Sequence, residues 1–101
     1  MFTRIVKNVV IVGAGGSGTG PDEYRCGYEY PEVYTLDAGN QPGTQVLDVR
    51  WEYAPHQPPP QYILPSFVDV VDDTHVSLSC QAIDDVSAER VKVRIIIIVA
   101  S

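Results

Sequence analysis

Alternation of apolar and polar residues between positions 47 and 53, within a strand predicted over residues 45–53, is the strongest structural signal in this sequence. The apolar positions, which we expect to face a core, are Leu47, Val49, Trp51 and Tyr53. The charged positions between them, which we expect to face solvent, are Asp48, Arg50 and Glu52. Because side chains of an extended strand point alternately to opposite faces, this pattern predicts a β-strand with one buried and one wet face.

The same alternation recurs elsewhere along the chain. In residues 75–82 the apolar positions are Val76, Leu78, Cys80 and Ala82, and the polar positions between them begin with Ser77 and Ser79. Four residues predicted to share one face of a further strand are Tyr24, Cys26, Tyr28 and Tyr30. Shorter or less regular strands are predicted over residues 5–12, 32–36, 67–71 and 90–100, which brings the total to about seven.

Segments rich in glycine and proline separate these strands. They cover residues 13–21, 37–43 and 55–65, and each is typical of a loop. A single helical turn is predicted over residues 84–89, capped by Asp84 or Asp85. The sequence therefore predicts one all-β domain over residues 1–101, a small antiparallel β-sandwich or barrel of about seven strands with long Gly- and Pro-rich loops.

The last predicted strand changes character halfway. Arg90, Lys92 and Arg94 alternate with apolar residues, whereas residues 95–99 are apolar at every position. Strand geometry puts Ile96 and Ile98 on the row that begins with the charged residues, so either a loop or a neighbouring subunit must cover them. We expect a protein partner, in a homo-oligomer or larger assembly. The residues expected at this interface are Ile96, Ile98, Pro58, Pro59, Pro60 and Tyr62.

Composition argues against some partners. Seven Lys and Arg against thirteen Asp and Glu give a net charge of -6. Phosphate backbones need a clustered basic surface and anionic membranes attract basic segments, so we expect neither a nucleic acid nor a membrane as partner. No apolar run approaches the ~20 residues that span a bilayer, and residues 1–18 do not have the pattern of a signal peptide.

Gly13, Gly15 and Gly18 follow an apolar run with the spacing G-x-G-x-x-G. This segment resembles the dinucleotide-binding fingerprint of Rossmann enzymes, and Asp37 stands close to the position of the ribose-binding acid. That chemistry needs a helix whose N-terminus faces the pyrophosphate, and the breaker Pro21 leaves no room for one. We therefore expect a glycine loop between strands, with no nicotinamide, flavin or other cofactor.

The sequence offers little for catalysis or metal binding. His56 lies in a proline loop and His75 lies near the start of a strand. The acid pairs Asp72–Asp73 and Asp84–Asp85 fall in predicted turns, outside any recognised calcium loop. We therefore expect neither an enzyme nor a metal site.

The two cysteines, Cys26 and Cys80, lack the spacing of metal ligands. They form either one disulfide or two buried free thiols, and both states are compatible with the sequence.

Two functions remain. Tyr24, Tyr28, Tyr30 and Tyr34 alternate with carboxylates, which suits stacking on sugars as well as packing within a sheet. A carbohydrate-binding or adhesion module is therefore the alternative. The favoured function is a structural subunit that assembles through protein contacts, because a chain of this size has a thin core. In size and composition it looks like the decoration, cement or tail-associated subunits of bacteriophage-like particles, so a virion location is favoured.

Overall fold

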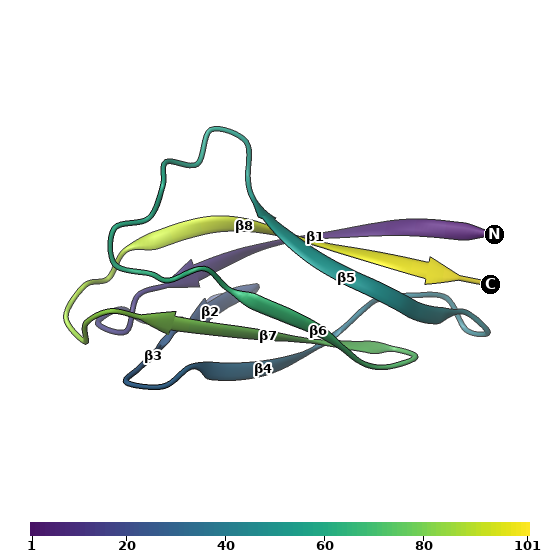
Figure 1. The fold of residues 1–101 in the computed structure, drawn as a ribbon, viewed down its shortest axis with the longest axis horizontal. Coiled ribbons are helices and arrows are strands. Elements are labelled where there is room, and N and C mark those ends of the chain that lie inside the picture. Colours follow the sequence, from purple (N-terminus) through teal and green to yellow (C-terminus); the bar gives the residue numbers. More distant parts are fainter.

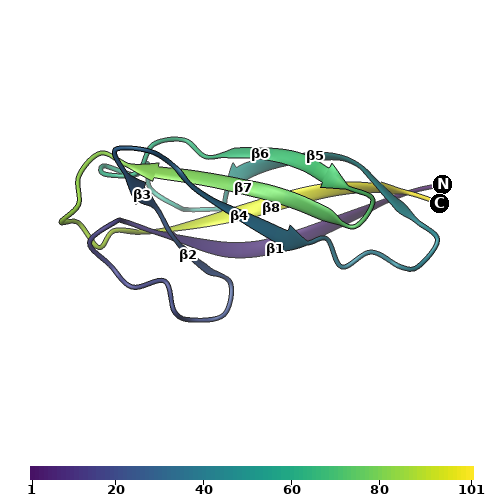
Figure 2. The same ribbon diagram turned by 90° about the horizontal axis from the view of Figure 1, so that it is seen from below.

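Eight strands and no helix make up the computed structural model, which describes residues 1–101 (Figure 1). The strands are β1 (Phe2–Val12), β2 (Glu23–Arg25), β3 (Gly27–Tyr28), β4 (Glu32–Asp37), β5 (Gln45–Tyr53), β6 (Phe67–Asp72), β7 (His75–Ala82) and β8 (Arg90–Ala100). They form two sheets stacked face to face, with the second sheet in front when the molecule is seen from below (Figure 2). The prediction of a small all-β sandwich is confirmed, and β5, β7 and β8 have the predicted boundaries.

The first sheet has the order β2-β1-β8-β5. Its central strand β8 runs antiparallel to β1 along its whole length, from the pair Phe2–Ala100 to the pair Val12–Arg90. On the other edge of β8 lies β5, also antiparallel. The outer edge of β1 pairs with β2 only at its last three residues, so the earlier part of this edge has no strand partner.

The second sheet is built around β7. β4 and β6 run antiparallel to β7 on opposite edges, and β3 pairs parallel with its last residues. Most strand pairs are antiparallel, as predicted. The two short parallel pairs arise because residues 22–28 cross from the first sheet to the second, following β1 and then β7.

The core lies between the inner rows of β8 and β7. The row of β8 consists of Val91, Val93, Ile95, Ile97 and Val99. The facing row of β7 consists of Val76, Leu78, Cys80 and Ala82, which confirms the prediction for that strand. Val49 and Trp51 of β5 are half-buried against this core, and the Trp51 ring packs edge-on to that of Tyr53 with centroids 5.0 Å apart.

The prediction that Leu47 belongs to the core is wrong. The pairing of β5 with β8 shifts between Val46 and Asp48, so Leu47 stands at a β-bulge. Val46 is buried in its place, opposite Val99, and Leu47 is 44% exposed. One extra residue in a strand reverses the facing of the residues before it, because strand side chains alternate with period two.

The predicted strand through Tyr24 and Tyr30 is divided at Cys26. The backbone N–H of Cys26 donates to the carbonyl of Val12, 2.8 Å away, which ties this residue to the end of β1. The chain then turns back at Glu29, whose φ is 72°. The four residues expected on one face therefore do not share one.

The helical turn predicted over residues 84–89 does not form. Oδ1 of Asp84 accepts hydrogen bonds from the N–H groups of Val86 and Ser87, as a cap would. The chain then extends, because the carbonyls of residues 87 and 89 accept hydrogen bonds from the glycine segment after β1. A packing partner remote in sequence has overridden the local preference.

Candidate interaction surfaces

The two sheets of this protein differ in charge. All seven lysines and arginines lie in strands of the first sheet: Arg4, Lys7, Arg25, Arg50, Arg90, Lys92 and Arg94. The same strands contain three acids, Glu23, Asp48 and Glu52. Strands of the second sheet contain no lysine or arginine, and their acids are Glu32, Asp37, Asp69 and Asp72. The molecule is acidic overall, yet its first sheet has an excess of positive charge.

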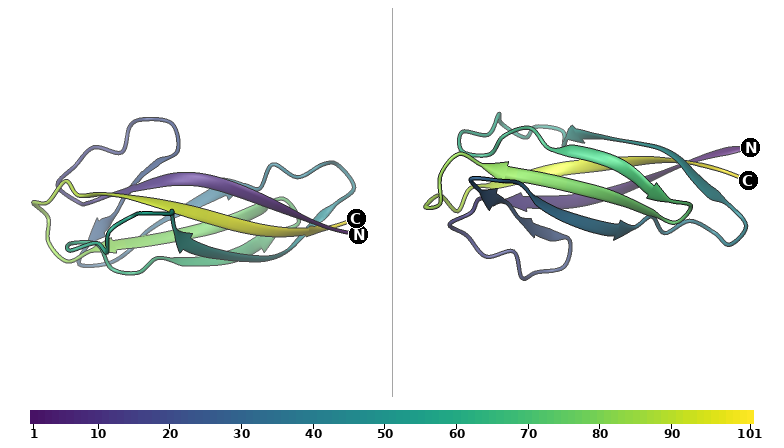
Figure 3. Two further views of the ribbon diagram at one scale, coloured as in Figure 1. Left: turned by 90° about the horizontal axis from the view of Figure 1, so that it is seen from above. Right: turned by 60° about the horizontal axis from the view of Figure 1, so that its bottom comes forward.

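The solvent-facing side of β1, β8 and β5 is here named the basic face, and the ribbon in Figure 3 (left) is seen from this side. The strands of this side carry most of the cations. Arg90 pairs with Glu23, with Nη2 2.8 Å from Oε2, and Arg94 pairs with Glu52 at 3.2 Å. The basic groups on this face without an ion pair in the chain are Arg4, Arg50 and Lys92.

Ile96 and Ile98 also lie on the basic face, outside the main core, as strand alternation predicts. Ile96 stands between Val6 of β1 and Arg50 of β5 and is only 1% exposed. The chain itself covers Ile96, so this side chain needs no partner to bury it. Ile98 is half-buried.

The end of the basic face nearest the two chain termini combines apolar side chains with two charges, because Arg4 of β1 and Asp48 of β5 flank Ile98 in the strand register. Phe2, opposite Ala100 in the sheet, is 73% exposed. On the same side of the sheet, Ile98 lies two residues before Ala100 in β8. Sequence reasoning missed Phe2, although its position in the alternation of β1 gives it the same facing as Val6.

The solvent-facing side of β4, β7 and β6, which is turned forward in the ribbon of Figure 3 (right), is here named the acidic face. The strand register places an apolar row at one end of it. Val33 and Phe67 both lie opposite Ser79, one from each edge of β7. Phe67 is 75% exposed, and Leu64 beside it in a shallow pocket is also exposed. The alternation of β7 determines which residues of the neighbouring strands β4 and β6 face outward. That Val33 and Phe67 lie in one row follows only from the strand register, which the structure supplies.

The other end of the acidic face is charged. Asp37 and Asp72 lie opposite His75, and Asp69 lies opposite Ser77 in the row between. Oδ1 of Asp72 is 2.9 Å from Nδ1 of His75. The hydrogen bond from the Thr74 N–H, followed by the contact with His75, lowers the pKa of Asp72. Asp72 is therefore ionised at neutral pH.

The proline segment is fastened to its own domain. The carboxylate of Glu89 accepts hydrogen bonds from the N–H groups of Gln61 and Tyr62, at 2.9 and 2.8 Å. Oε1 of Gln57 accepts one from the Lys92 N–H, 2.8 Å away. Between these anchors Pro58 and Pro59 are exposed and Pro60 is half-buried, and beyond them the Tyr62 side chain is 39% exposed.

The structure separates the four tyrosines of the possible ligand surface. Tyr24 and Tyr34 pack edge-on against each other with ring centroids 5.0 Å apart, and the Tyr34 hydroxyl donates to the Arg25 carbonyl. Burial raises the pKa of both. Tyr28 and Tyr30 are exposed instead. None of the five surface pockets is lined by any of these rings.

The glycine motif has a packing role. The N–H groups of Gly13 and Gly15 donate to the carbonyls of Glu89 and Ser87, at 2.8 and 3.0 Å. A Cβ on Gly15 would lie 2.0 Å from the Val86 carbonyl oxygen. These glycines allow the backbone to approach residues 86–89, and their N–H groups are already bonded within the chain.

Cys26 and Cys80 are both free and buried, and their thiols lie within hydrogen-bonding reach of each other. This hydrogen bond and burial raise the pKa of Cys26. Of the two states that the sequence allows, the structure has the pair of buried thiols.

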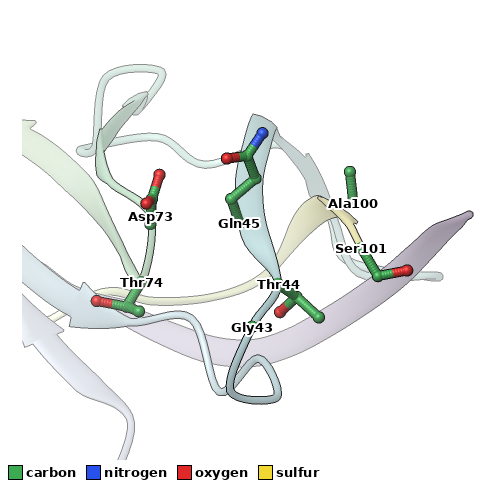
Figure 4. Close-up of a pocket in the computed structure, with 7 residues that line it drawn as sticks. All are labelled: Gly43, Thr44, Gln45, Asp73, Thr74, Ala100 and Ser101. Atoms are coloured by element: carbon green, nitrogen blue, oxygen red, sulfur yellow. The ribbon is translucent and has the colours of Figure 1, made fainter.

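A larger open pocket lies at the termini end of the sandwich (Figure 4). Its volume is about 570 Å³, and its lining residues are Gly43, Thr44, Gln45, Asp73, Thr74, Ala100 and Ser101. Asp73 is the one ionisable side chain among them. No group of three or more His, Cys, Asp or Glu side chains with the arrangement of a metal site is present in the chain.

The structure contains no helix of sufficient length and apolar character to cross a membrane. No protein-family model matches this sequence, and the searches of curated proteins and of solved structures found no similar chain.

Proposed function

We propose that this protein is a structural subunit that assembles through protein–protein contacts. The observation that carries the proposal is the exposure of large apolar side chains on both open faces, above all Phe2 on the basic face and Phe67 on the acidic face. Exposed apolar patches on a small domain are typical of interaction sites. Because the two faces point away from each other, one copy has room for two neighbours.

The thin core supports the same proposal. Seventeen buried residues form its main cluster. A chain of this size buries only about two-thirds of the surface that it exposes when unfolded, so contacts between copies add burial that the single chain cannot supply. Ile98, the exposed prolines Pro58 and Pro59, Pro60 and Tyr62 belong to the proposed interface. Ile96 is buried within its own chain on the same face, so it underlies the proposed interface and is not part of its contact surface.

Sedimentation equilibrium over a range of protein concentrations tests the proposal. We expect an assembly heavier than the 11.1 kDa chain. Ile98→Lys should shift it toward the monomer while the circular dichroism spectrum stays that of a β protein, because a charge is costly to bury in a contact. The matched control is Ile83→Lys, at an exposed isoleucine in the loop after β7. A wild-type chain that stays monomeric at every concentration contradicts the proposal.

The finer proposal is a small virion protein, a decoration, cement or tail-associated subunit of a bacteriophage-like particle. Its support is the small size and all-β composition of the chain. Fractionation of the natural source on a density gradient tests it. The protein should migrate with large particles, and recovery only in the light fractions argues for a different assembly.

Carbohydrate binding stays a second candidate, in a narrower form. It is favoured by the exposure of Tyr28 and of Tyr30, 72% exposed, on either side of the carboxylate of Glu29. An aromatic ring beside a carboxylate suits stacking and hydroxyl bonding to a sugar. Binding on a glycan array that Tyr30→Ala abolishes would support this function. A glycan array on which the protein binds no sugar would contradict this function.

A further inference from the structure

We infer that the basic face of one copy docks on the acidic face of the next, so that copies stack head to tail. The inference rests on the proposed assembly function and names the partner as a second copy of this chain. Its basis is the segregation of charge between the two sheets.

Unpaired charges of opposite sign stand on the two faces. Arg4, Arg50 and Lys92 on the basic face have no acidic partner within their own chain. The acidic face offers Asp37 and Asp69, which accept only short-range backbone hydrogen bonds and form no ion pair within the chain. Complementary potentials of this kind favour one docking partner and orientation over others.

Apolar side chains accompany the charges on both faces. The basic face presents Phe2 with Ile98 at the end near the termini. The acidic face presents Phe67 with Val33 in one row across β7. An interface combines apolar with polar contacts, and each face contains both kinds of side chain.

Like-with-like docking is disfavoured. Two basic faces would bring their unpaired arginines together, and two acidic faces would bring their aspartates together, so the contact has to join unlike faces.

Edge-to-edge pairing along β1 is disfavoured by Lys7. The strand register puts this residue on the inner row, opposite Ile95, and it is half-buried. An inward-pointing lysine on an edge strand is a known protection against pairing with another sheet.

The two faces lie on opposite sides of the sandwich (Figure 2). A contact between unlike surfaces repeats with every added copy, so it builds an open stack unless a rotation closes a ring. The molecule measures 44 × 26 × 21 Å, and a face of this length is compatible with the ~800 Å² per partner of a standard interface.

Charge reversals on each face test the inference. Arg50→Glu alters the basic face, and Asp69→Lys alters the acidic face. Each should weaken self-association of the full chain by at least about tenfold, because like charges then meet in the contact. Asp85→Lys, in a loop outside both faces, changes the net charge as Asp69→Lys does and should leave association unchanged. Arg4→Glu repeats the test of the basic face, and circular dichroism checks that each variant is folded.

Mixing the two face variants is the decisive experiment. The Arg50→Glu chain keeps an intact acidic face, and the Asp69→Lys chain keeps an intact basic face. One contact between intact unlike faces can therefore form between them, and the two altered faces again carry charges of opposite sign. We expect each variant alone to associate at least about tenfold more weakly than wild type, and the equimolar mixture to form heavier species in sedimentation velocity than either variant alone.

The outcomes separate this inference from the proposed function. If the wild type assembles but the mixture holds only monomers, or if the single variants assemble like wild type, the assignment of faces is overturned and the assembly function stands. If the wild type is monomeric, both are overturned.

Discussion

The carboxylate of Glu23 in β2 lies 2.8 Å from Nη2 of Arg90 in β8, and the pair reaches across β1, which separates these two strands. β2 pairs with β1 over only three residues. The ion pair therefore adds a second attachment for the segment that crosses between the sheets. The hydrogen bond from Arg90, followed by that from the Gly20 N–H, holds the pKa of Glu23 below its ordinary value of 4.5.

We predict that Glu23→Gln reduces the dependence of stability on acid pH. A carboxyl whose pKa is lower in the folded state stabilises the fold above its unfolded pKa, and this contribution is lost as the pH falls through the folded pKa. The difference in unfolding free energy between wild type and variant should therefore be largest above pH 4.5 and shrink below it. Urea unfolding at a series of pH values measures it.

Asp85→Asn is the control for this experiment, because Asp85 is an exposed acid without an ion pair. A Glu23→Gln curve parallel to that of wild type through the acid range would mean that the pair does not form in solution. Added salt should reduce the effect, since charges at the surface are screened.

Gly15→Ala is predicted to destabilise the fold by roughly 1–3 kcal/mol, the usual cost of forcing extra atoms into a packed site. The new Cβ would lie 2.0 Å from the Val86 carbonyl oxygen, and the three atoms nearest to it all belong to the Val86 backbone, so one of the two segments has to move. Chemical denaturation measures the change. Ser17→Ala, at an exposed position of the same loop, should stay within about 0.5 kcal/mol of wild type. Equal stability of the two variants would refute the close approach.

The strands were predictable because their signal is local. Alternation places β5, β7 and β8 correctly, since every second side chain of a strand has to face the core. The bulge at Leu47 leaves no such signal, because Val46 is equally apolar and either register fits the pattern. The glycine segment depends on residues 86–89, about seventy positions away, and no local pattern reports such a partner.

The candidate surfaces were predictable only in part. Alternation puts Ile98 on the outer side of β8, and the structure agrees. The division of charge between the sheets required knowing which strands share a sheet, because Arg4 and Arg50 are remote in sequence and join β8 from opposite edges. The composition gives the net charge of the chain but does not show how this charge is distributed between the two sheets.

Alanine substitutions at neighbouring positions test the bulge in β5. Val46→Ala removes buried atoms opposite Val99 and should cost roughly 1–2 kcal/mol, less than a larger side chain would. Leu47→Ala removes more atoms but from an exposed position, so it should cost no more than about 0.5 kcal/mol. Thermal unfolding measures which of the two variants loses more stability. A larger loss of stability for Leu47→Ala would mean that Leu47, and not Val46, faces the core, as it would in a strand without a bulge.

The last prediction concerns the thiols of Cys26 and Cys80. Both are buried, and their mutual hydrogen bond and burial raise the pKa of Cys26. The thiolate is the reactive form of cysteine, so the native protein should react with a disulfide reagent such as Ellman's reagent only as fast as it opens. In denaturant, without reductant, both thiols should react at once. Ser17→Cys, exposed in the glycine loop, is the control and should react at once in the native protein. Fast reaction of both native thiols would show that the core is open, and no reaction after denaturation would show that the pair is a disulfide.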